Sequence, residues 1–514
     1  MAAQTVREHE RKFAVEPDFV VPDLALAGLP VVERGRAVTL TATYYDTDDL
    51  RLARSKVTLR RRTGGKDAGW HLKLLADPST PNVRDEMQLP STTSRTPPAE
   101  LAELVLGLTR GAELQPLATM RTKRTPTVLR SRDGTVAIEV VDDFVTVTEG
   151  PVKGLTYREL EVEALSPGAD LDIVASLLLQ AGATEGVFRS KGARALGAPS
   201  ELAPLVPLPG RATPADPAAL VVRNHLRTHV AVLVRQDTRV RRDLPDAVHQ
   251  FRVAARRLRA GLQSFAPLVE PEWSAHLRGE LGWIAGVLGQ ARDTEVLEAH
   301  LIAGVRALPA ELDRAAGLVL IQDDLEASLT EATKAAHEAM NSARYLALLD
   351  ALVSAAEVPR TTPLADGPSD EVLPPLVQRR FKKLSRMADL LANELEGHDD
   401  DWHATRIAGK KARYVAEAVV PVFGAPAKRY VKQMEQVTEL LGEHQDCAIA
   451  AETVRRLITR DTGPNASFTL GALYDQQRQR VKEIRHEFVA AWPEIRDKRW
   501  RRWLVGPPHS GPES

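Results

Sequence analysis

The sequence predicts an α+β protein of two domains, in which a closed β barrel precedes an all-α region built from two copies of one helical unit. Three observations lead to this prediction. Residues 1–198 consist mostly of runs rich in Val, Thr, Leu and Tyr, separated by turn residues. A stiff proline-rich linker follows at 199–217. From 218 onward, apolar residues recur at helical spacing, and one basic motif occurs twice.

Length and composition limit the classes of protein that this chain can be. Its 514 residues are too many for one hydrophobic core, so at least two domains are expected. A hydrophobic content of 43% and a charged content of 27% indicate a globular protein in water. The single cysteine, Cys447, excludes an intramolecular disulfide. Because no apolar segment is long enough to cross a bilayer and no secretory signal follows Met1, we expect a cytoplasmic protein without a membrane partner.

Eight candidate strands fill the N-terminal domain. They combine β-branched and aromatic residues with bounding turn signals such as Gly64-Gly65. Two helices are expected to interrupt them, near 98–109 and 170–182. Eight strands with so few helices can close into a barrel, which removes exposed edges. The predicted strands cover residues 6–15, 37–46, 56–63, 69–75, 83–89, 117–130, 135–148 and 156–165.

The first predicted strand carries its charges on one face. Side chains alternate between faces along a strand, so Glu8, Glu10 and Lys12 point the same way. Two carboxylates and an ammonium are costly to bury without counter-charges. Carboxylates at this spacing suit a hard cation such as Mg²⁺ or Mn²⁺, held partly through the phosphates of a substrate, and the lysine suits a phosphate. The alternative is an amphipathic edge strand whose charged face is solvated.

Later strands repeat this arrangement of charge on one face. Arg60 shares a face with Arg62, and His71 shares a face with Lys73. A barrel with basic and acidic rows inside is not an ordinary apolar core, but a polyanion together with a divalent cation would neutralise both rows. The alternative places the same charges in water and the apolar side chains inside. The acidic row on the last strand consists of Glu159, Glu161 and Glu163.

This ordered set of charges resembles the CYTH superfamily, the triphosphate tunnel metalloenzymes, over about residues 4–198. The resemblance implies an eight-stranded antiparallel tunnel that binds triphosphate with Mg²⁺ or Mn²⁺. Members hydrolyse inorganic triphosphate or thiamine triphosphate, or cyclise ATP. The matching elements, in order, are Glu8-x-Glu10-x-Lys12, Tyr45-Asp46-Thr47, Arg60-x-Arg62, Lys73, Glu159-x-Glu161-x-Glu163 and Ser190-Lys191-x-x-x-Arg194-Ala195-Leu196.

The resemblance also implies roles for particular residues. The metal ligands would be Glu8, Glu10, Glu159, Glu161 and Glu163. The side chains that clamp phosphoryl oxygens would be Lys12, Arg60, Arg62, Lys73, Arg124 and Lys191. The catalytic residues would be Glu8, Glu10, Lys12 and Glu161, and this chemistry needs positioning and charge neutralisation more than a protein nucleophile. Two placements stay open, because Arg121 and Lys123 compete with Arg124, and Asp142 competes with Asp143.

The helical domain, expected at residues 218–505, contains an internal repeat. Its copies span about 218–358 and 371–505, with a break at 359–370. The first motif is His249-x-x-Arg252-x-x-x-Arg256-Arg257-x-Arg259, and it recurs 154 residues later (403 − 249) as His403-x-x-Arg406-x-x-x-Lys410-Lys411-x-Arg413. The second is Leu288-Gly289-x-x-Arg292-Asp293, and it recurs 153 residues later (441 − 288) as Leu441-Gly442-x-x-Gln445-Asp446. Such a duplication implies a pseudo-twofold axis, with the two basic helices facing a shared surface.

Each repeated helix has one basic face. On helical geometry one stripe consists of His249, Arg252, Arg256 and Arg259, and its partner consists of His403, Arg406, Lys410 and Arg413. Like charges at this spacing repel, and few carboxylates lie within either helix, so an external polyanion is the economical explanation. The alternatives are two solvated basic faces, or histidines that are buried caps or core residues.

This half resembles the CHAD domain, the conserved-histidine α-helical domain, over about residues 218–505. The resemblance rests on both basic helices and both Leu-Gly-x-x-x-Asp elements. It implies two four-helix bundles that bind inorganic polyphosphate in a basic channel. The binding residues would be His249, Arg252, Arg256, Arg257, Arg259, His403, Arg406, Lys410, Lys411 and Arg413. Gln445 stands where the first repeat has Arg292, so a role of Arg292 need not be shared.

A basic and aromatic run ends the helical domain at 498–503. It is compatible with contact to nucleic acid, but a terminal helix that packs Trp500 and Trp503 against the bundle is favoured. Residues 506–514 are expected to be disordered.

Together these features predict a metal-dependent hydrolase of inorganic triphosphate or short polyphosphate, tethered to a module that binds polyphosphate and raises the local substrate concentration. Three other functions are open: a non-catalytic protein that binds polyphosphate and localises to its granules, an adenylate cyclase, and a thiamine triphosphatase. Nucleic acid is a less favoured partner, and the oligomeric state is open.

Overall fold

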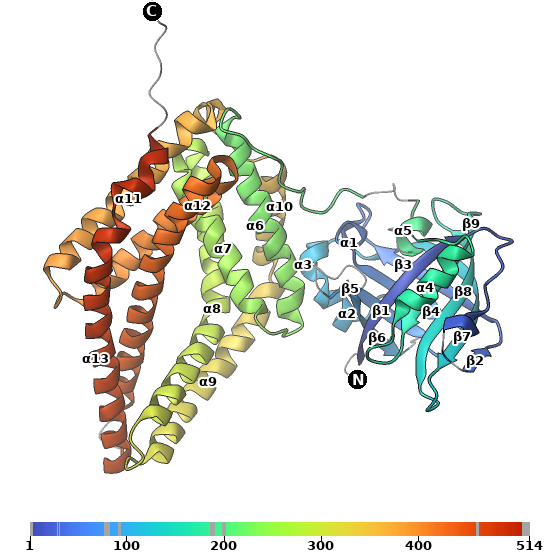
Figure 1. Cartoon of the computed structure of the whole chain (residues 1–514), viewed down its shortest axis with the longest axis horizontal. Coiled ribbons are helices and arrows are strands. Elements are labelled where there is room, and N and C mark those ends of the chain that lie inside the picture. Colours follow the sequence, from blue (N-terminus) through green and yellow to red (C-terminus); the bar gives the residue numbers. More distant parts are fainter. Residues whose placement is uncertain are drawn as a thin grey trace, which may run out of the picture. The chain divides into compact units, whose positions relative to one another are not determined.

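The structure is a computed structural model that describes residues 4–27, 29, 31–76, 83–90, 94–185, 191–197, 202–458 and 462–505. The chain divides into two units, Met1–Leu205 and Val206–Ser514, and the division falls within the predicted linker (Figure 1). The expected disordered tail, 506–514, and the expected end of the first domain at 198 lie outside the described residues. None of the described helices is both long and apolar enough to cross a membrane.

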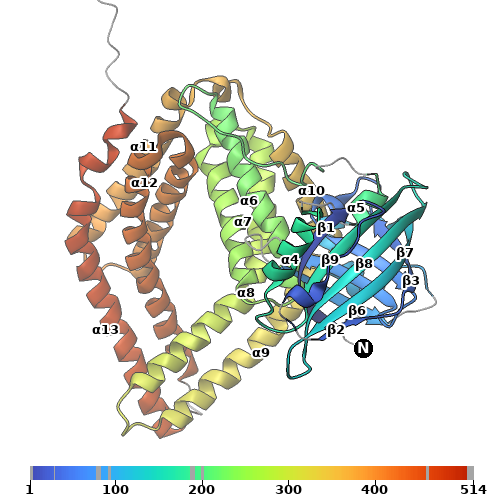
Figure 2. The same ribbon diagram turned by 45° about the vertical axis from the view of Figure 1, so that its right-hand side comes forward.

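Eight antiparallel strands close into a barrel in the first unit, which confirms the predicted fold class. The strands neighbour one another in the order β1, β6, β5, β4, β3, β7, β8, β9, and pairing of β9 with β1 completes the ring (Figure 2). Their bounds are β1 Gln4–Val15, β3 Val38–Asp46, β4 Thr58–Thr63, β5 Gly69–Leu75, β6 Val83–Pro90, β7 Gln115–Arg130, β8 Val136–Glu149 and β9 Thr156–Ala164. Sequence reasoning missed two short strands, β2 (Val31–Arg34) and β10 (Thr184–Glu185), which pair with β7 and β1.

An apolar core lies on the outer face of the barrel beneath the helix α4 (Leu171–Gln180). Phe13 of β1 and Leu160 of β9 pack there with Val174 and Leu178 of α4, and all four side chains are fully buried. Alternation along β1 and β9 then turns the charged residues between them toward the interior of the ring. The apolar residues of β9 that alternate with the acidic row therefore pack in this outer core, and not inside the barrel.

Short helices complete the first unit. The predicted helix near 98–109 is split into α2 (Ala99–Leu104) and α3 (Leu106–Thr109), and α1 (Arg51–Arg54), α5 (Lys191–Ala195) and the 3₁₀ helix η1 (Leu24–Ala27) were not predicted. Helix α5 has a particular position, because its Ala195 packs with Tyr44, Met120 and Val145 in an apolar cluster. This packing holds the first residue of α5, Lys191, against the barrel interior.

All the elements assigned among the described residues of the second unit are helices, joined by loops. The first half contains α6 (Ala218–Arg241), α7 (Ala247–Ser264), α8 (Pro271–Ala307), α9 (Arg314–Asn341) and α10 (Ala343–Glu357). The second half contains α11 (Ser369–Asn393), α12 (Asp399–Leu457), α13 (Pro464–Ile495) and the 3₁₀ helix η4 (Lys498–Leu504). The predicted break at 359–370 contains the 3₁₀ helix η3 (Pro363–Asp366), and another, η2 (Ala266–Leu268), lies between α7 and α8.

Both halves follow one plan of four helices. Helix α12 is interrupted at Gly424, whose φ of 61° is a left-handed conformation that glycine adopts readily, so it is two helices joined end to end. Helices α9 and α10 meet at Ser342, which caps α10 by accepting a hydrogen bond from the Tyr345 amide. With α9 and α10 counted as one interrupted helix and α12 counted as two, each half has four helical segments. The first basic motif lies on α7, and its copy lies on the first part of α12.

The basic and aromatic run at the end packs against the second bundle. The Trp503 ring lies 5.1 Å from the Phe423 ring and 6.3 Å from the Tyr430 ring, measured between centroids. Trp500 donates its indole N–H to the Glu494 carbonyl at 3.0 Å. These contacts agree with the packing interpretation of this run.

Candidate functional site

The register of β1 against its neighbours brings the predicted charged residues together. Glu10 lies opposite Glu163, and Lys12 lies opposite Glu161 on β9. Residues that face each other across an antiparallel pair share a face of the sheet, so the charged row of β1 meets the acidic row of β9. Glu8 and Glu161 are buried, each with 8% of its surface exposed.

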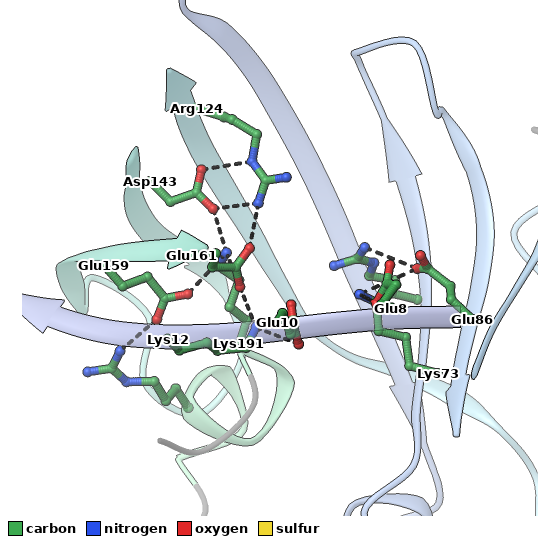
Figure 3. A network of polar contacts seen from close by, with 12 residues as sticks. Glu8, Glu10, Lys12, Lys73, Glu86, Arg124, Asp143, Glu159, Glu161 and Lys191 are labelled. Carbon is green, nitrogen blue, oxygen red and sulfur yellow. Dashed lines mark hydrogen bonds and ion pairs between the residues drawn. The ribbon is translucent and has the colours of Figure 1, made fainter. Parts of the chain in front are cut away.

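Lys191 is the centre of one group of ion pairs inside the barrel, called here the Lys191 cluster. Its Nζ lies 2.5 Å from Asp143 Oδ2, 3.0 Å from Glu159 Oε1 and 3.1 Å from Glu161 Oε1. Figure 3 shows three acidic side chains converging on this ammonium from β8 and β9. Three more cations belong to the cluster. Lys12 and Arg124 both pair with Glu161, and Arg194 pairs with Glu159.

Arg124 holds the acidic residues of β8 and β9 in place. Its Nε and Nη2 donate to the two Asp143 oxygens at 2.9 and 2.6 Å, and Nη2 also donates to Glu161 at 2.9 Å. Arg121 and Lys123 are exposed, so Arg124 is the inward member of its run. Asp143 is likewise the inward acid, fully buried.

Asp142 lies on the opposite face of β8 from Asp143. Both of its oxygens accept hydrogen bonds from Arg158, at 2.9 and 2.8 Å. Of the residues that compete in the sequence, Arg124 and Asp143 are therefore the ones that point into the barrel.

A second group of ion pairs forms around Glu86, and Glu10 lies between the two groups in Figure 3. This Glu86 cluster contains Glu8, whose Oε2 lies 2.5 Å from Lys73 Nζ. His71 Nδ1 lies 2.9 Å and Arg60 Nη2 lies 3.4 Å from Glu86 Oε1. Sequence reasoning did not name Glu86 as a site residue, although its position on the same face as Arg84 of β6 was the available signal.

Burial and neighbouring charges shift the pKa values of the acidic residues in different directions. Burial, with a hydrogen bond to Glu86, raises the pKa of Glu8 to about 8 although Lys73 opposes the shift. Burial also raises the pKa of Glu163 to about 7, with help from Glu10 and Glu161. Burial has the same tendency at Glu161, but Lys12, Lys191 and Arg124 outweigh it and hold the pKa of Glu161 well below its ordinary value.

The cations near the Glu86 cluster are crowded. Arg62 has only 5% of its surface exposed and pairs with Asp67. Burial and the adjacent charges of Arg60 and Arg124 lower the pKa of Arg62 to about 9. An anion among these guanidinium groups would relieve their repulsion.

The interior offers oxygen donors of the kind that Mg²⁺ and Mn²⁺ prefer. Glu10 and Glu163 face each other directly, and burial, with a smaller contribution from Glu10 and Glu161, raises the pKa of Glu163, so a cation here would stabilise its charged form. Within the described ranges, however, no three acidic, histidine or cysteine side chains are gathered as a metal-binding group. The donor chemistry fits a divalent cation, but the carboxylates would have to exchange their lysine and arginine partners for it.

Helices α7 and α12 bring the two basic stripes of the helical unit together. Arg256 donates from Nε to the Tyr414 hydroxyl at 2.8 Å, and Arg257 Nη2 lies 3.2 Å from Glu417 Oε2. Burial, together with Arg406 and Arg256, lowers the pKa of Lys410 to about 7. The stripes therefore share one surface, in which cations from both repeats crowd one another.

Carboxylates from other helices neutralise part of these stripes, which corrects the expectation based on carboxylates within each helix. Asp293 of the Leu-Gly-x-x-x-Asp element lies on α8 and pairs with Arg252 at 2.6 Å. Neither motif histidine is buried, so the core-histidine alternative is wrong. His249 is exposed, and His403 Nδ1 lies 2.5 Å from Gln445 Oε1.

Comparisons with known proteins agree with this division of the chain. A model of the CYTH domain matches residues 7–186, and a model of the CHAD domain matches residues 224–455. An uncharacterised protein of Mycobacterium tuberculosis is 34% identical over 508 residues, covering 94% of this chain and 95% of that protein. The chain belongs to the family of proteins in which a CYTH domain is fused to a CHAD domain.

Two solved structures are similar to about half of the chain. PptA from Streptomyces chartreusis is 24% identical and has a TM-score of 0.47, with 54% of this chain and 100% of that chain covered. The CHAD domain from the plant Ricinus communis is 24% identical with a TM-score of 0.44, covering 55% and 94% of the two chains. Members of the CYTH superfamily are triphosphate tunnel enzymes and are typically metal-dependent.

Proposed function

We propose that the barrel hydrolyses inorganic triphosphate or short polyphosphate with Mg²⁺ or Mn²⁺, and that the helical unit binds polyphosphate. The observation that carries the proposal is the barrel interior. Cations from β1, β4, β5, β7 and α5 meet there with carboxylates from β1, β6, β8 and β9, as the Lys191 and Glu86 clusters show. A polyanion and a divalent cation together would replace these internal ion pairs.

The residues divide into two roles in this proposal. Lys12, Arg60, Arg62, Lys73, Arg124 and Lys191 would bind phosphoryl oxygens, which draws them away from their present acidic partners. Glu8, Glu10, Glu159, Glu161 and Glu163 would be released to hold the metal, and a carboxylate among them would orient the attacking water. The metal, when bound, supplies polarisation of the phosphoryl oxygens. The protein contributes positioning and charge neutralisation.

A phosphate-release assay with tripolyphosphate and either metal tests the enzymatic half. Arg124→Met should lower turnover by about 10²–10³-fold, because it removes a charged donor to the transferred group. Lys123→Met is the matched control, since Lys123 is exposed on the neighbouring position of the same strand and should retain activity. Absence of phosphate release by the wild type with both metals would contradict the proposal.

A non-catalytic role is the second candidate, and one observation favours it. The acidic side chains of the Lys191 cluster are already paired with cations of the chain itself. Glu10→Gln separates the two functions, because a hydrolase loses turnover whereas a binding protein has none to lose. ATP and thiamine triphosphate belong in the same substrate panel, to detect cyclase or thiamine triphosphatase activity.

The helical half of the proposal also predicts a location. Binding of long polyphosphate to the shared basic surface would place the protein at polyphosphate granules in the cytoplasm. Competition between long polyphosphate and DNA for the full chain, at a stated salt concentration, tests the ligand. Displacement of polyphosphate by DNA at equal phosphate concentration would favour a nucleic-acid partner instead.

A further inference from the structure

Alignment of the two repeats reveals that the shared basic surface is asymmetric. The motif offset of 154 residues makes Arg257 correspond to Lys411 and Arg259 correspond to Arg413. Corresponding positions on opposite sides of a pseudo-twofold axis would be expected to have matching surroundings. The surroundings of the corresponding arginine and lysine residues differ, because two positions that carry carboxylates in one repeat carry uncharged residues in the other.

The paired side of this surface consists of Arg257 and Arg413 with the carboxylates of Glu417 and Glu435. Arg413 Nε lies 2.7 Å from Glu417 Oε1, and its Nη2 lies 2.9 Å from Glu435 Oε1. Arg257 Nη2 reaches the second oxygen of Glu417 at 3.2 Å. Two arginines are thus neutralised by two carboxylates.

The unpaired side consists of Arg259 and Lys411, and it lacks both carboxylates. Glu435 corresponds to Gly282 (435 − 282 = 153), and Glu417 corresponds to Gln263 (417 − 263 = 154). The Arg259 guanidinium lies directly over Gly282, because a Cβ added to this glycine would lie 3.3 Å from Arg259 Cζ. Across the described parts of the chain, no carboxylate lies within ion-pair distance of Arg259 or Lys411.

Further cations extend the unpaired side. Arg380 of α11 donates a hydrogen bond to the Gln263 carbonyl of α7, which places α11 against the helix that carries Arg259. Burial lowers the pKa of Lys411, and the charges of Lys383, Arg380, Arg259 and Arg278 lower it further. Lys383 also lines a surface groove of about 590 Å³ along α11. The other charged residues that line this groove are Arg379, Lys382 and Arg386, all basic and all exposed.

We propose that the unpaired side, continuous with the groove on α11, is the principal anchoring site for a chain of linked phosphates, and that the paired side contributes little to its affinity. The inference rests on the proposed polyphosphate binding. A polyanion on the paired side has to separate existing ion pairs, which offsets what it gains. On the unpaired side it meets crowded cations whose mutual repulsion it relieves.

The two corresponding positions, 282 and 435, provide the test. Binding of inorganic polyphosphate to the full chain is measured by calorimetry at one fixed salt concentration. Gly282→Glu places a carboxylate beside Arg259 and should weaken binding about tenfold, as expected for loss of one charge-assisted contact. Gly282→Gln has a similar size without charge and crowds Arg259 in the same way, so it is the steric control, and Gly282→Glu should bind about tenfold more weakly than it does. Glu435→Gln removes one of the two carboxylates that pair with Arg413, while Glu417 remains, and should tighten binding.

Lys411→Gln tests the same site independently of helix packing, and it should weaken binding about tenfold and reduce the salt dependence of the affinity. Thermal unfolding of each variant checks that the helical unit is intact. Equal affinity of Gly282→Glu and Gly282→Gln, or full affinity of Lys411→Gln, would overturn the assignment of the site and leave polyphosphate binding in place. Failure of the wild type to bind polyphosphate would overturn both.

Discussion

Replacement of Lys191 by methionine is the sharpest test of the barrel interior. The substitution keeps most of the buried side-chain volume and removes one ammonium from among Asp143, Glu159 and Glu161, at 2.5, 3.0 and 3.1 Å. Loss of one partner from a buried ion pair costs about 3–5 kcal/mol. Arg124, which still pairs with Asp143 and Glu161, keeps the expected loss near the lower end of this range.

The pH dependence of the Lys191→Met effect follows from the shifted carboxyl groups. Burial tends to raise the pKa of Asp143 and of Glu161, but the neighbouring cations, Lys191 among them, hold both pKa values below the ordinary range. A depressed carboxyl pKa adds stability above the unfolded pKa, and this stability is lost as the pH falls through the folded value. Without Lys191 these pKa values rise, so the variant becomes protonated at higher pH. The stability difference between the two proteins should therefore shrink on acidification.

Differential scanning calorimetry of the full chain measures this effect, with the transition of the helical unit as an internal reference. A loss of about 3 kcal/mol in a unit of this size lowers its Tm by roughly 6–12 °C near pH 7.5, and by less below about pH 4, where ordinary carboxyl groups become protonated. Lys153→Met, which removes an exposed lysine, should change stability by less than about 0.5 kcal/mol. An equal loss at both pH values would refute the reasoning, because it would mean that the carboxylates do not share this cation.

Three further outcomes are expected. Glu163→Gln should stabilise the first unit by about 1–3 kcal/mol at pH 8 but not at pH 5, as measured by urea unfolding. The reason is that the raised pKa of Glu163 makes its ionisation above about pH 7 unfavourable in the folded state. Polyphosphate binding should take up a proton at Lys410 and weaken above about pH 7, and Lys410→Arg should remove this dependence in calorimetric titrations. Gly289→Ala should lower the free energy of unfolding of the helical unit, because its Cβ would lie 2.9 Å from Arg252 Cζ and would push Arg252 away from Asp293. Gly279→Ala on the same helix meets no atom within 4 Å and should raise the free energy of unfolding by about 1 kcal/mol.

The faces of the barrel strands were predictable because alternation is a strict property of extended chain. Once a run was recognised as a strand, Glu161 and Leu160 had to lie on opposite sides, whichever side proved to be the interior. The short strands β2 and β10 were missed because four or two residues carry too little periodic signal. The positions of α5 and its lysine depend on apolar packing with strands distant in sequence.

The partners of the crowded charged residues were harder to predict. They depend on strand register, which is set by contacts between segments distant in sequence. Arg124 lies directly opposite Asp143 in the pairing of β7 with β8. The choice among the basic residues and the choice between the two aspartates were therefore linked, because one register decides both. Similarly, Asp293 lies on a different helix from its partner Arg252. Inspection of carboxylates within α7 alone could not reveal it, which is why the basic stripes were predicted to be less neutralised than they are.

The two units differ in how their cations are compensated, and this difference bears on the role of the metal. An anion that enters the barrel must take Lys191 or Lys73 from its carboxylate partners, which leaves buried acids without compensation. A divalent cation supplies that compensation, so under the proposed function anion and metal should bind the barrel cooperatively. The unpaired side of the helical unit has no acids to release. Polyphosphate should therefore bind there without a metal, and addition of Mg²⁺ should strengthen binding only in the barrel.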